Sequence, residues 1–188
     1  FIDVGGGTTD VAVVREGGIE GAKMFALGGR AFTKRISGEL GMSFEEAEKI
    51  KISYSNKKIS LNMARKVEQI LKNDCEVWLS GIELSLSEFS ASDLLPSRIL
   101  LCGGGSQLPG IKRALEGRNW LKNLPFAKKP VVSFIQPRDV VNIVDTTNQL
   151  QGIADVTPMG LANLTLDLVG EEGVISSILR RAVRVIQN

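Results

Sequence analysis

The residues best suited to chemistry stand together at the start of the chain. They are Asp3, Gly5, Gly6, Gly7, Thr8, Thr9 and Asp10. Consecutive glycines let the backbone approach a ligand closely and turn amide groups toward an anion. The threonine hydroxyls add donors, and a carboxylate beside a polyphosphate needs a divalent cation between the like charges. The loop therefore predicts a phosphate site in which Asp3 positions Mg²⁺.

The context of this loop excludes two better-known phosphate loops. The Gly-Lys-Ser/Thr ending of a Walker A loop is absent from the sequence. A dinucleotide fingerprint opens a helix, whereas residues 11–14 after Asp10 are β-branched or small and favour a strand. The loop thus joins strand to strand. One alternative stays open, a hairpin turn whose polar side chains only satisfy local backbone groups.

A second set of polar residues falls on a predicted helix that begins after Ser43. Ser43 and Glu46 form the pattern of a capping box, which specifies the start of the helix. Further along, Glu48 and Lys51 are three residues apart and share one face, so both could contact a sugar hydroxyl and a base edge. The alternative for this pair is a solvated ion pair worth a few tenths of a kcal/mol.

A third motif combines a strand, a glycine turn and a helix. The apolar run over residues 98–102 predicts a buried strand, and an amphipathic pattern continues through Leu115. Between them stand Gly103, Gly104, Gly105 and Ser106. Glycines at this point let the backbone lie against a ligand, and the turn precedes a helix N-terminus suited to polar groups.

In this order the three motifs resemble those of the actin-like ATPase superfamily, which includes actin, sugar kinases, DnaK-type chaperones and FtsA. The resemblance implies a ribonuclease H-like α/β fold, with a mixed five-stranded sheet, flanking helices and a small helical insertion. It implies ATP or ADP with Mg²⁺ as ligands. The first loop would hold the β- and γ-phosphates, Asp3 and Asp10 would act in catalysis, and the other two motifs would bind adenosine.

Within the superfamily the motifs are most similar to the FtsA family of bacterial cell-division proteins. That resemblance implies an ATP-dependent scaffold that polymerises, binds a tubulin-like partner and pairs with an N-terminal half carrying another phosphate loop. Hydrolysis by the present chain alone is expected to be negligible. Alternatives are another actin-fold protein, such as a pilus-assembly ATPase or a chaperone, and an interaction module of this fold that has lost turnover.

The amino-acid composition excludes several classes of function. The chain has 188 residues, of which 43% are hydrophobic, enough for a substantial core. Its 23 basic and 21 acidic residues give a net charge of +2. This charge is too small to attract nucleic acid electrostatically, so the composition does not support nucleic-acid binding. Histidine is absent, so histidine-based catalysis and histidine-ligated metals are excluded. Cys75 and Cys102 fall in apolar segments, as expected for reduced, buried thiols in a cytoplasmic protein.

Periodicity predicts how the elements are organised. Strands are expected over residues 1–4, 11–14, 19–27 and 130–135. From Ser60 to Phe89, apolar residues recur in steps of three and four, which predicts one long helix with a break near Gly81. The predicted domains are a large one, residues 1–27 and 91–188, and an inserted helical one, residues 28–90.

The last part of the chain predicts two helices. Thr157 as cap and Pro158 at the first helical position mark one start. Residues 174–188 form a basic amphipathic helix, which could lie on the inner face of the cell membrane; docking on the domain is preferred because the apolar face lacks Trp and Phe. No segment is long and apolar enough to span a bilayer.

Overall fold

The structure is a computed structural model that describes residues 1–89, 94–166 and 168. The chain falls into two compact units, Phe1–Ile135 and Gln136–Asn188. All three predicted motifs lie in the first unit. Each unit is described by itself.

The first unit is built on a mixed five-stranded sheet, as the sequence predicts. Its strands are β1 (Ile2–Val4), β2 (Thr9–Arg15), β3 (Gly18–Phe25), β4 (Arg98–Cys102) and β5 (Val131–Phe134). Their order is β3-β2-β1-β4-β5. The first three strands form an antiparallel meander, whereas β4 runs parallel to both β1 and β5. The glycine loop and the second glycine turn consequently leave neighbouring parallel strands at the same end of the sheet.

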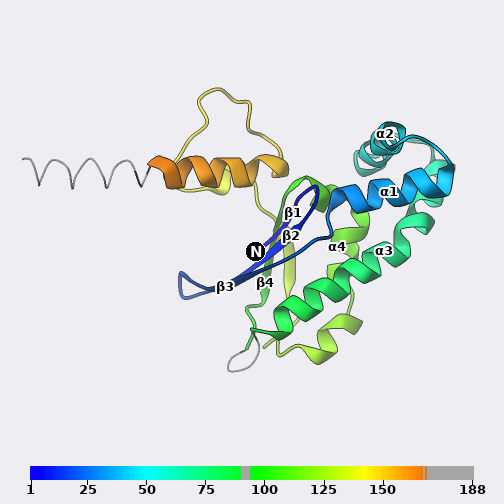
Figure 1. Ribbon diagram of the computed structural model, residues 1–188. Coiled ribbons are helices and arrows are strands. Elements are labelled where there is room, and N and C mark those ends of the chain that lie inside the picture. Colours follow the sequence, from blue (N-terminus) through cyan, green and yellow to red (C-terminus); the bar gives the residue numbers. More distant parts are fainter. Residues whose placement is uncertain (90–93, 167, 169–188) are drawn as a thin grey trace, which may run out of the picture. The chain divides into compact units, whose positions relative to one another are not determined.

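Helices gather on one side of this sheet (Figure 1). They are α1 (Gly29–Leu40), α2 (Phe44–Ser55), α3 (Leu61–Ser87) and α4 (Pro109–Glu116). The predicted capping box is present at α2: Ser43 Oγ accepts from the Glu46 amide at 3.2 Å, and the Glu46 carboxylate accepts from the Ser43 amide at 2.9 Å. Short 3₁₀ turns η1 (Gly104–Gln107) and η2 (Asn119–Asn123) flank α4.

The long helix predicted from the apolar stripe is confirmed, but the expected break at Gly81 is wrong. Helix α3 runs unbroken for 27 residues, and Val67, Leu71 and Trp78 on its stripe are buried. A Cβ on Gly81 would lie 2.8 Å from the ring of Phe25. The glycine therefore serves close packing between the helix and β3, which compensates for its low helix propensity.

One hydrophobic core holds the first unit together. Buried side chains of the sheet, such as Val4 and Leu101, share it with Phe32 of α1 and Trp78 of α3. The predicted inserted domain, residues 28–90, lies inside this unit, and its helices pack into the same core as the sheet. Its separateness as a domain stays a prediction.

The second unit contains two 3₁₀ turns, η3 (Pro137–Asp139) and η4 (Ile153–Asp155), followed by a helix from residue 156. The helix begins one residue before Thr157, so Thr157 lies in its first turn and is not its cap. The amphipathic segment 174–188 lies outside the described residues. Every helix in the described ranges is too short or too polar to cross a bilayer.

Candidate functional site

Three segments that are distant in sequence meet around Gly29. The Gly29 amide donates to the carbonyl of Gly5 at 2.9 Å, and the Arg30 amide donates to the carbonyl of Gly6 at 2.8 Å. A Cβ on Gly29 would also lie 3.7 Å from Cα of Gly105. The glycine loop after β1, the start of α1 and the turn after β4 are thus in direct contact.

This convergence depends on glycines that leave no room for a side chain. A Cβ on Gly28 would lie 2.7 Å from the carbonyl oxygen of Gly5, and one on Gly105 would lie 2.7 Å from a methyl group of Val4. Gly103 has φ +81° and ψ 150°, a region essentially reserved for glycine. A side chain at any of these three positions would collide with backbone or side-chain atoms of β1 and the loop that follows it.

Two glycines of the first loop, by contrast, have room for a side chain. Gly6 and Gly7 are exposed, and among the described atoms a Cβ on Gly7 would meet nothing within 4 Å. A Cβ on Gly6 would touch only the flexible side chain of Arg30, at 3.7 Å. Packing does not require these two residues to be glycine. Because both residues are exposed, a ligand can approach the backbone of the loop at this point.

Two carboxylates stand opposite each other beside this loop. Asp3 on β1 is the register partner of Asp10 on β2, so both side chains lie on the same face of the sheet. The Thr8 hydroxyl donates to Asp10 Oδ2 at 3.3 Å. Like charges at directly opposed positions destabilise a sheet, and a cation between them would relieve the repulsion. Within the described residues, no cluster of three acidic or sulfur side chains could hold a metal alone.

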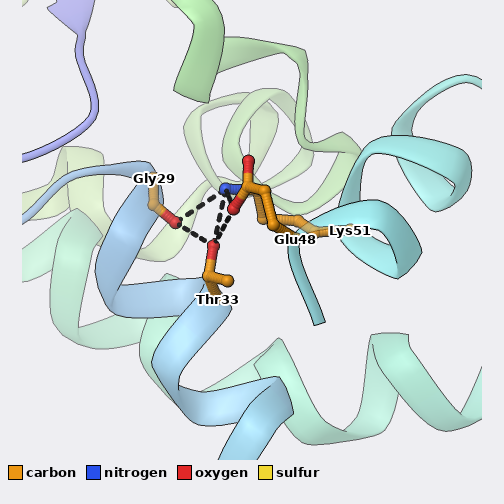
Figure 2. A network of polar contacts seen from close by, with 4 residues as sticks. All are labelled: Gly29, Thr33, Glu48 and Lys51. Carbon is orange, nitrogen blue, oxygen red and sulfur yellow. Dashed lines mark hydrogen bonds and ion pairs between the residues drawn. The ribbon is translucent and has the colours of Figure 1, made fainter. Parts of the chain in front are cut away.

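Glu48 and Lys51 belong to a network at the start of α1 (Figure 2). The Lys51 ammonium donates to the Gly29 carbonyl at 2.9 Å, to Thr33 Oγ1 at 2.8 Å and to Glu48 Oε2 at 2.9 Å. Its side chain is only 10% exposed, against 35% for Glu48. The pair is therefore a buried tie between α1 and α2, and the solvated ion pair considered from the sequence does not describe it.

The electrostatics of the network favour a charged Glu48. Partial burial raises the pKa of this carboxyl, but hydrogen bonds from Thr33 and Lys51, with the charge of Lys51, outweigh burial and hold the pKa below its usual value. The three donors of Lys51 have three acceptors, and these bonds engage only Oε2 of Glu48. Glu48 is thus the member of the pair with an acceptor atom to offer a ligand.

Two hydroxyls expected from the sequence to face a ligand point into the protein. Thr9 is fully buried; its hydroxyl donates to the Leu27 carbonyl at 2.7 Å and accepts from Trp78 Nε1 at 2.9 Å. The Ser106 hydroxyl, also buried, donates to the Gly103 carbonyl at 2.7 Å. Both hydroxyls therefore hold parts of the protein together, and neither is directed toward a ligand as the sequence suggested.

Thr33 is the site residue that sequence reasoning did not assign. It lies one turn after Gly29, and its hydroxyl connects the Gly29 carbonyl to Glu48 and Lys51. In the sequence, Thr33 follows Gly29 by four residues, a spacing at which a helical threonine can bond to the carbonyl of the earlier residue. Only the packing of α1 on α2 shows which acceptor and donor the hydroxyl serves.

Solved structures of known proteins share the fold of this chain. The chain aligns over 86% of its length with a protein of the PilM-PilN type IV pilus biogenesis complex (TM-score 0.59, 22% identity, 44% of that chain). It aligns over 92% of its length with MreB 5 of Spiroplasma citri bound to AMPPNP (TM-score 0.56, 16% identity, 54% of that chain). At these identities the likeness shows the fold, which is that of the actin-like ATPases.

Within that class the chain belongs to the FtsA family. The model of the family described as cell division protein FtsA matches residues 1–154. FtsA of Bacillus subtilis (strain 168) is 28% identical over 131 residues, covering 59% of this chain and 29% of the relative. FtsA of Enterococcus hirae is 25% identical over 190 residues, covering 88% and 42%. The chain thus spans less than half the length of these relatives.

Proposed function

We propose that this chain forms one wall of an ATP·Mg²⁺ site in a cell-division scaffold of the FtsA type. The amides of Gly6 and Gly7 would hold the β- and γ-phosphates, with the Thr8 hydroxyl at the loop edge. The Gly5 amide, which the sequence also assigns to the phosphates, instead donates to the Thr8 carbonyl at 2.9 Å and closes the loop. Asp3 would hold Mg²⁺ through water, and Asp10 would orient the loop or a catalytic water. Charge neutralisation and in-line positioning are what phosphoryl transfer requires from such groups.

The observation that carries this proposal is the open glycine loop beside two opposed carboxylates. Packing explains the glycines at positions 28, 103 and 105, but it does not explain Gly6 and Gly7. A loop with exposed glycines and no steric need for glycine at those positions is suited to close approach by an anion. The Asp3–Asp10 pair supplies the complementary reason for a cation at the same place.

The adenosine would lie between α2 and the second glycine turn. Exposed Gly104 would let the base or ribose rest on backbone, as expected from the sequence. Glu48 would accept a hydrogen bond from a ribose hydroxyl through Oε1. Lys51 would act as a positioning residue, because its donors already hold Glu48 and the start of α1.

Nucleotide binding would then influence polymerisation and the binding of a division partner in the complete protein. The residues proposed to contact nucleotide also connect the helices to the sheet, because Lys51 of α2 bonds to the Gly29 carbonyl of α1 and the Gly29 amide bonds to Gly5 after β1. A ligand that fixes this junction can bias the arrangement of the elements attached to it, provided that it binds one arrangement better. Whether this scaffold also hydrolyses ATP depends on groups beyond these residues.

The direct test is a titration of the 188-residue chain with ATP, followed by amide NMR, in the presence and absence of Mg²⁺. We expect shifts at Gly5–Gly7, Gly104 and Glu48, and at least a tenfold weaker response without Mg²⁺. Asp3→Asn should remove the Mg²⁺ dependence, whereas Asp139→Asn, in the second unit, should not. Shifts that ignore Mg²⁺, or that avoid the glycine loop, would contradict the proposal.

A further inference from the structure

The guanidinium of Arg30 lies beside the open part of the glycine loop. Arg30 is the second residue of α1, and its amide donates to the Gly6 carbonyl at 2.8 Å. Its side chain then reaches the same glycine, because a Cβ on Gly6 would lie 3.7 Å from Arg30 Nε and 4.0 Å from Arg30 Cγ. A ligand that approaches the loop at Gly6 therefore meets this guanidinium.

This cation is exposed and is not engaged by a carboxylate of the described residues. None of the ion pairs in the described ranges includes Arg30. Glu48 is near enough for the charge of Arg30 to help lower the pKa of its carboxyl, but its ion pair is with Lys51. The guanidinium thus lies in the region between Glu48 and the loop, where its donors are open to a further anion.

The position of Arg30 in its helix gives no structural reason for a positive charge. The amide end of a helix is positively polarised, so a cation in the first turn is disfavoured. Helix α1 has no acidic residue in its first turn to offset this repulsion. A bound anion beside the guanidinium would offset it.

The backbone amides at the start of α1 are already engaged, so they do not supply this anion contact themselves. The Gly29 amide donates to the Gly5 carbonyl, the Arg30 amide to Gly6 and the Ala31 amide to the Gly28 carbonyl at 3.0 Å. The side chain of Arg30 is therefore the donor group that α1 offers to the loop. A guanidinium carries five donors in a planar fork that matches two phosphate oxygens.

Arg30 and the carboxylate pair approach the loop from different faces of the sheet. Asp3 and Asp10 alternate with the buried side chains of β1 and β2, so they lie on the face that those helices do not cover. Arg30 comes from α1, in the layer of helices on the other side (Figure 1). The carboxylates need a metal ion to act on a phosphate, whereas a guanidinium binds phosphate oxygens directly.

We propose that Arg30 binds the phosphate chain of the nucleotide directly, on the side of the loop opposite the carboxylate pair, and makes the site selective for adenosine polyphosphates over adenosine. This inference rests on the proposed function, because it assigns a further binding residue to the same site. It also separates two contributions to affinity: the Asp3–Asp10 side depends on Mg²⁺, and the contribution of Arg30 does not.

Two charge-removing variants of the same helix test the proposal. Arg30→Gln and Lys34→Gln each remove one exposed cation from α1, one helical turn apart. ATP and adenosine are titrated into the 188-residue chain and both variants, with and without Mg²⁺. We expect Arg30→Gln to weaken ATP binding about tenfold in both conditions and to leave adenosine binding unchanged, because a charge-assisted contact to phosphate is lost. Lys34→Gln should change ATP affinity by less than about twofold, since an exposed charge farther from the loop is screened.

Two further measurements separate binding from folding. The Tm of Arg30→Gln should not fall, because the variant removes a cation that the helix dipole disfavours. Arg30→Lys should recover only part of the ATP affinity, because an ammonium lacks the planar fork of the guanidinium.

The outcomes distinguish this inference from the proposed function. If the native chain binds ATP and Arg30→Gln binds it equally well, Arg30 does not contact the phosphates, and only this inference fails. Equal losses for Arg30→Gln and Lys34→Gln, an equal loss of adenosine binding, or a loss confined to Mg²⁺-containing solutions would also overturn it. If the native chain binds no ATP, the proposed function fails together with it.

Discussion

The two glycine turns of this protein look alike in sequence and differ in structure. Gly103 and Gly105 touch β1 so closely that a single Cβ would collide with its backbone. Gly6 and Gly7 lie in the loop after β1, at the same end of the sheet, yet a Cβ there would meet open space or one flexible side chain. One turn needs glycine to fold, whereas the other does not.

This difference separates structural glycines from candidate ligand-binding ones. A glycine that packing requires would be present whether or not a ligand binds. A glycine that packing does not require weakens the folded state through its entropy, so a function is the better explanation for it. The comparison leads to predictions in which stability and nucleotide binding respond in opposite ways at the two turns.

The largest effect on stability is expected for Gly103→Ala. Alanine at φ +81° and ψ 150° is strained, and its Cβ would lie 2.5 Å from the Val4 carbonyl oxygen. We expect a loss of about 3 kcal/mol or more in the free energy of unfolding, measured by urea denaturation. Gly38→Ala in α1, where a Cβ meets open space, is the matched control and should stabilise by about 0.5–1 kcal/mol. Similar losses for both variants would contradict this account of the turn.

The next effect concerns the network that joins α1 to α2. Lys51→Met leaves the Gly29 carbonyl, Thr33 and the Glu48 carboxylate without their shared donor. We expect a loss of about 2 kcal/mol, because the acceptors stay partly buried. Lys49→Met on the exposed side of the same helix should change stability by less than about 0.5 kcal/mol. If Lys51→Met left the free energy of unfolding unchanged, the network would not stabilise the contact between α1 and α2.

The pH dependence of stability should report the same network on a smaller scale. Because the pKa of Glu48 is lower in the folded state than in the unfolded state, the charged carboxylate contributes stability above about pH 4.3. That contribution is lost as pH falls through the folded pKa. The difference in urea midpoint between the native chain and Glu48→Gln should therefore be constant near neutral pH and shrink toward pH 3. A difference independent of pH would show that the charge of Glu48 is not involved.

The smallest effect on stability is expected for Gly7→Ala. A Cβ at this position meets no described atom within 4 Å, and the backbone has no positive φ. The free energy of unfolding should change by no more than about 0.5 kcal/mol in either direction. A loss comparable to that of Gly103→Ala, in the same urea experiment, would remove the distinction between the two turns.

Much of the first unit could be predicted from local patterns. The apolar stripe located α3, and the capping box placed the start of α2, because both signals arise from neighbouring residues. The mixed sheet followed from the resemblance of the motifs. Gly81 was misjudged because its helix propensity is local, whereas its contact with Phe25 comes from a strand far away in sequence.

The site was predicted less completely, for physical reasons that particular residues show. The loop motif suggested that Thr9 faces a ligand, but strand alternation places its side chain on the buried face with that of Val11, and the side chain of Asp10 on the other face. Thr33 was missed because its partners lie on another helix. The Glu48–Lys51 spacing indicated a shared face, but only the packing of α2 on α1 shows that the lysine is buried.

The most direct test of the central claim is the affinity of Gly7→Val for ATP·Mg²⁺, measured together with its stability. The account predicts a folded variant with nearly native urea midpoint and at least a tenfold weaker affinity, because the side chain occupies the approach of the phosphates to the loop. Native affinity in a stably folded Gly7→Val would contradict the claim that this loop holds the phosphates.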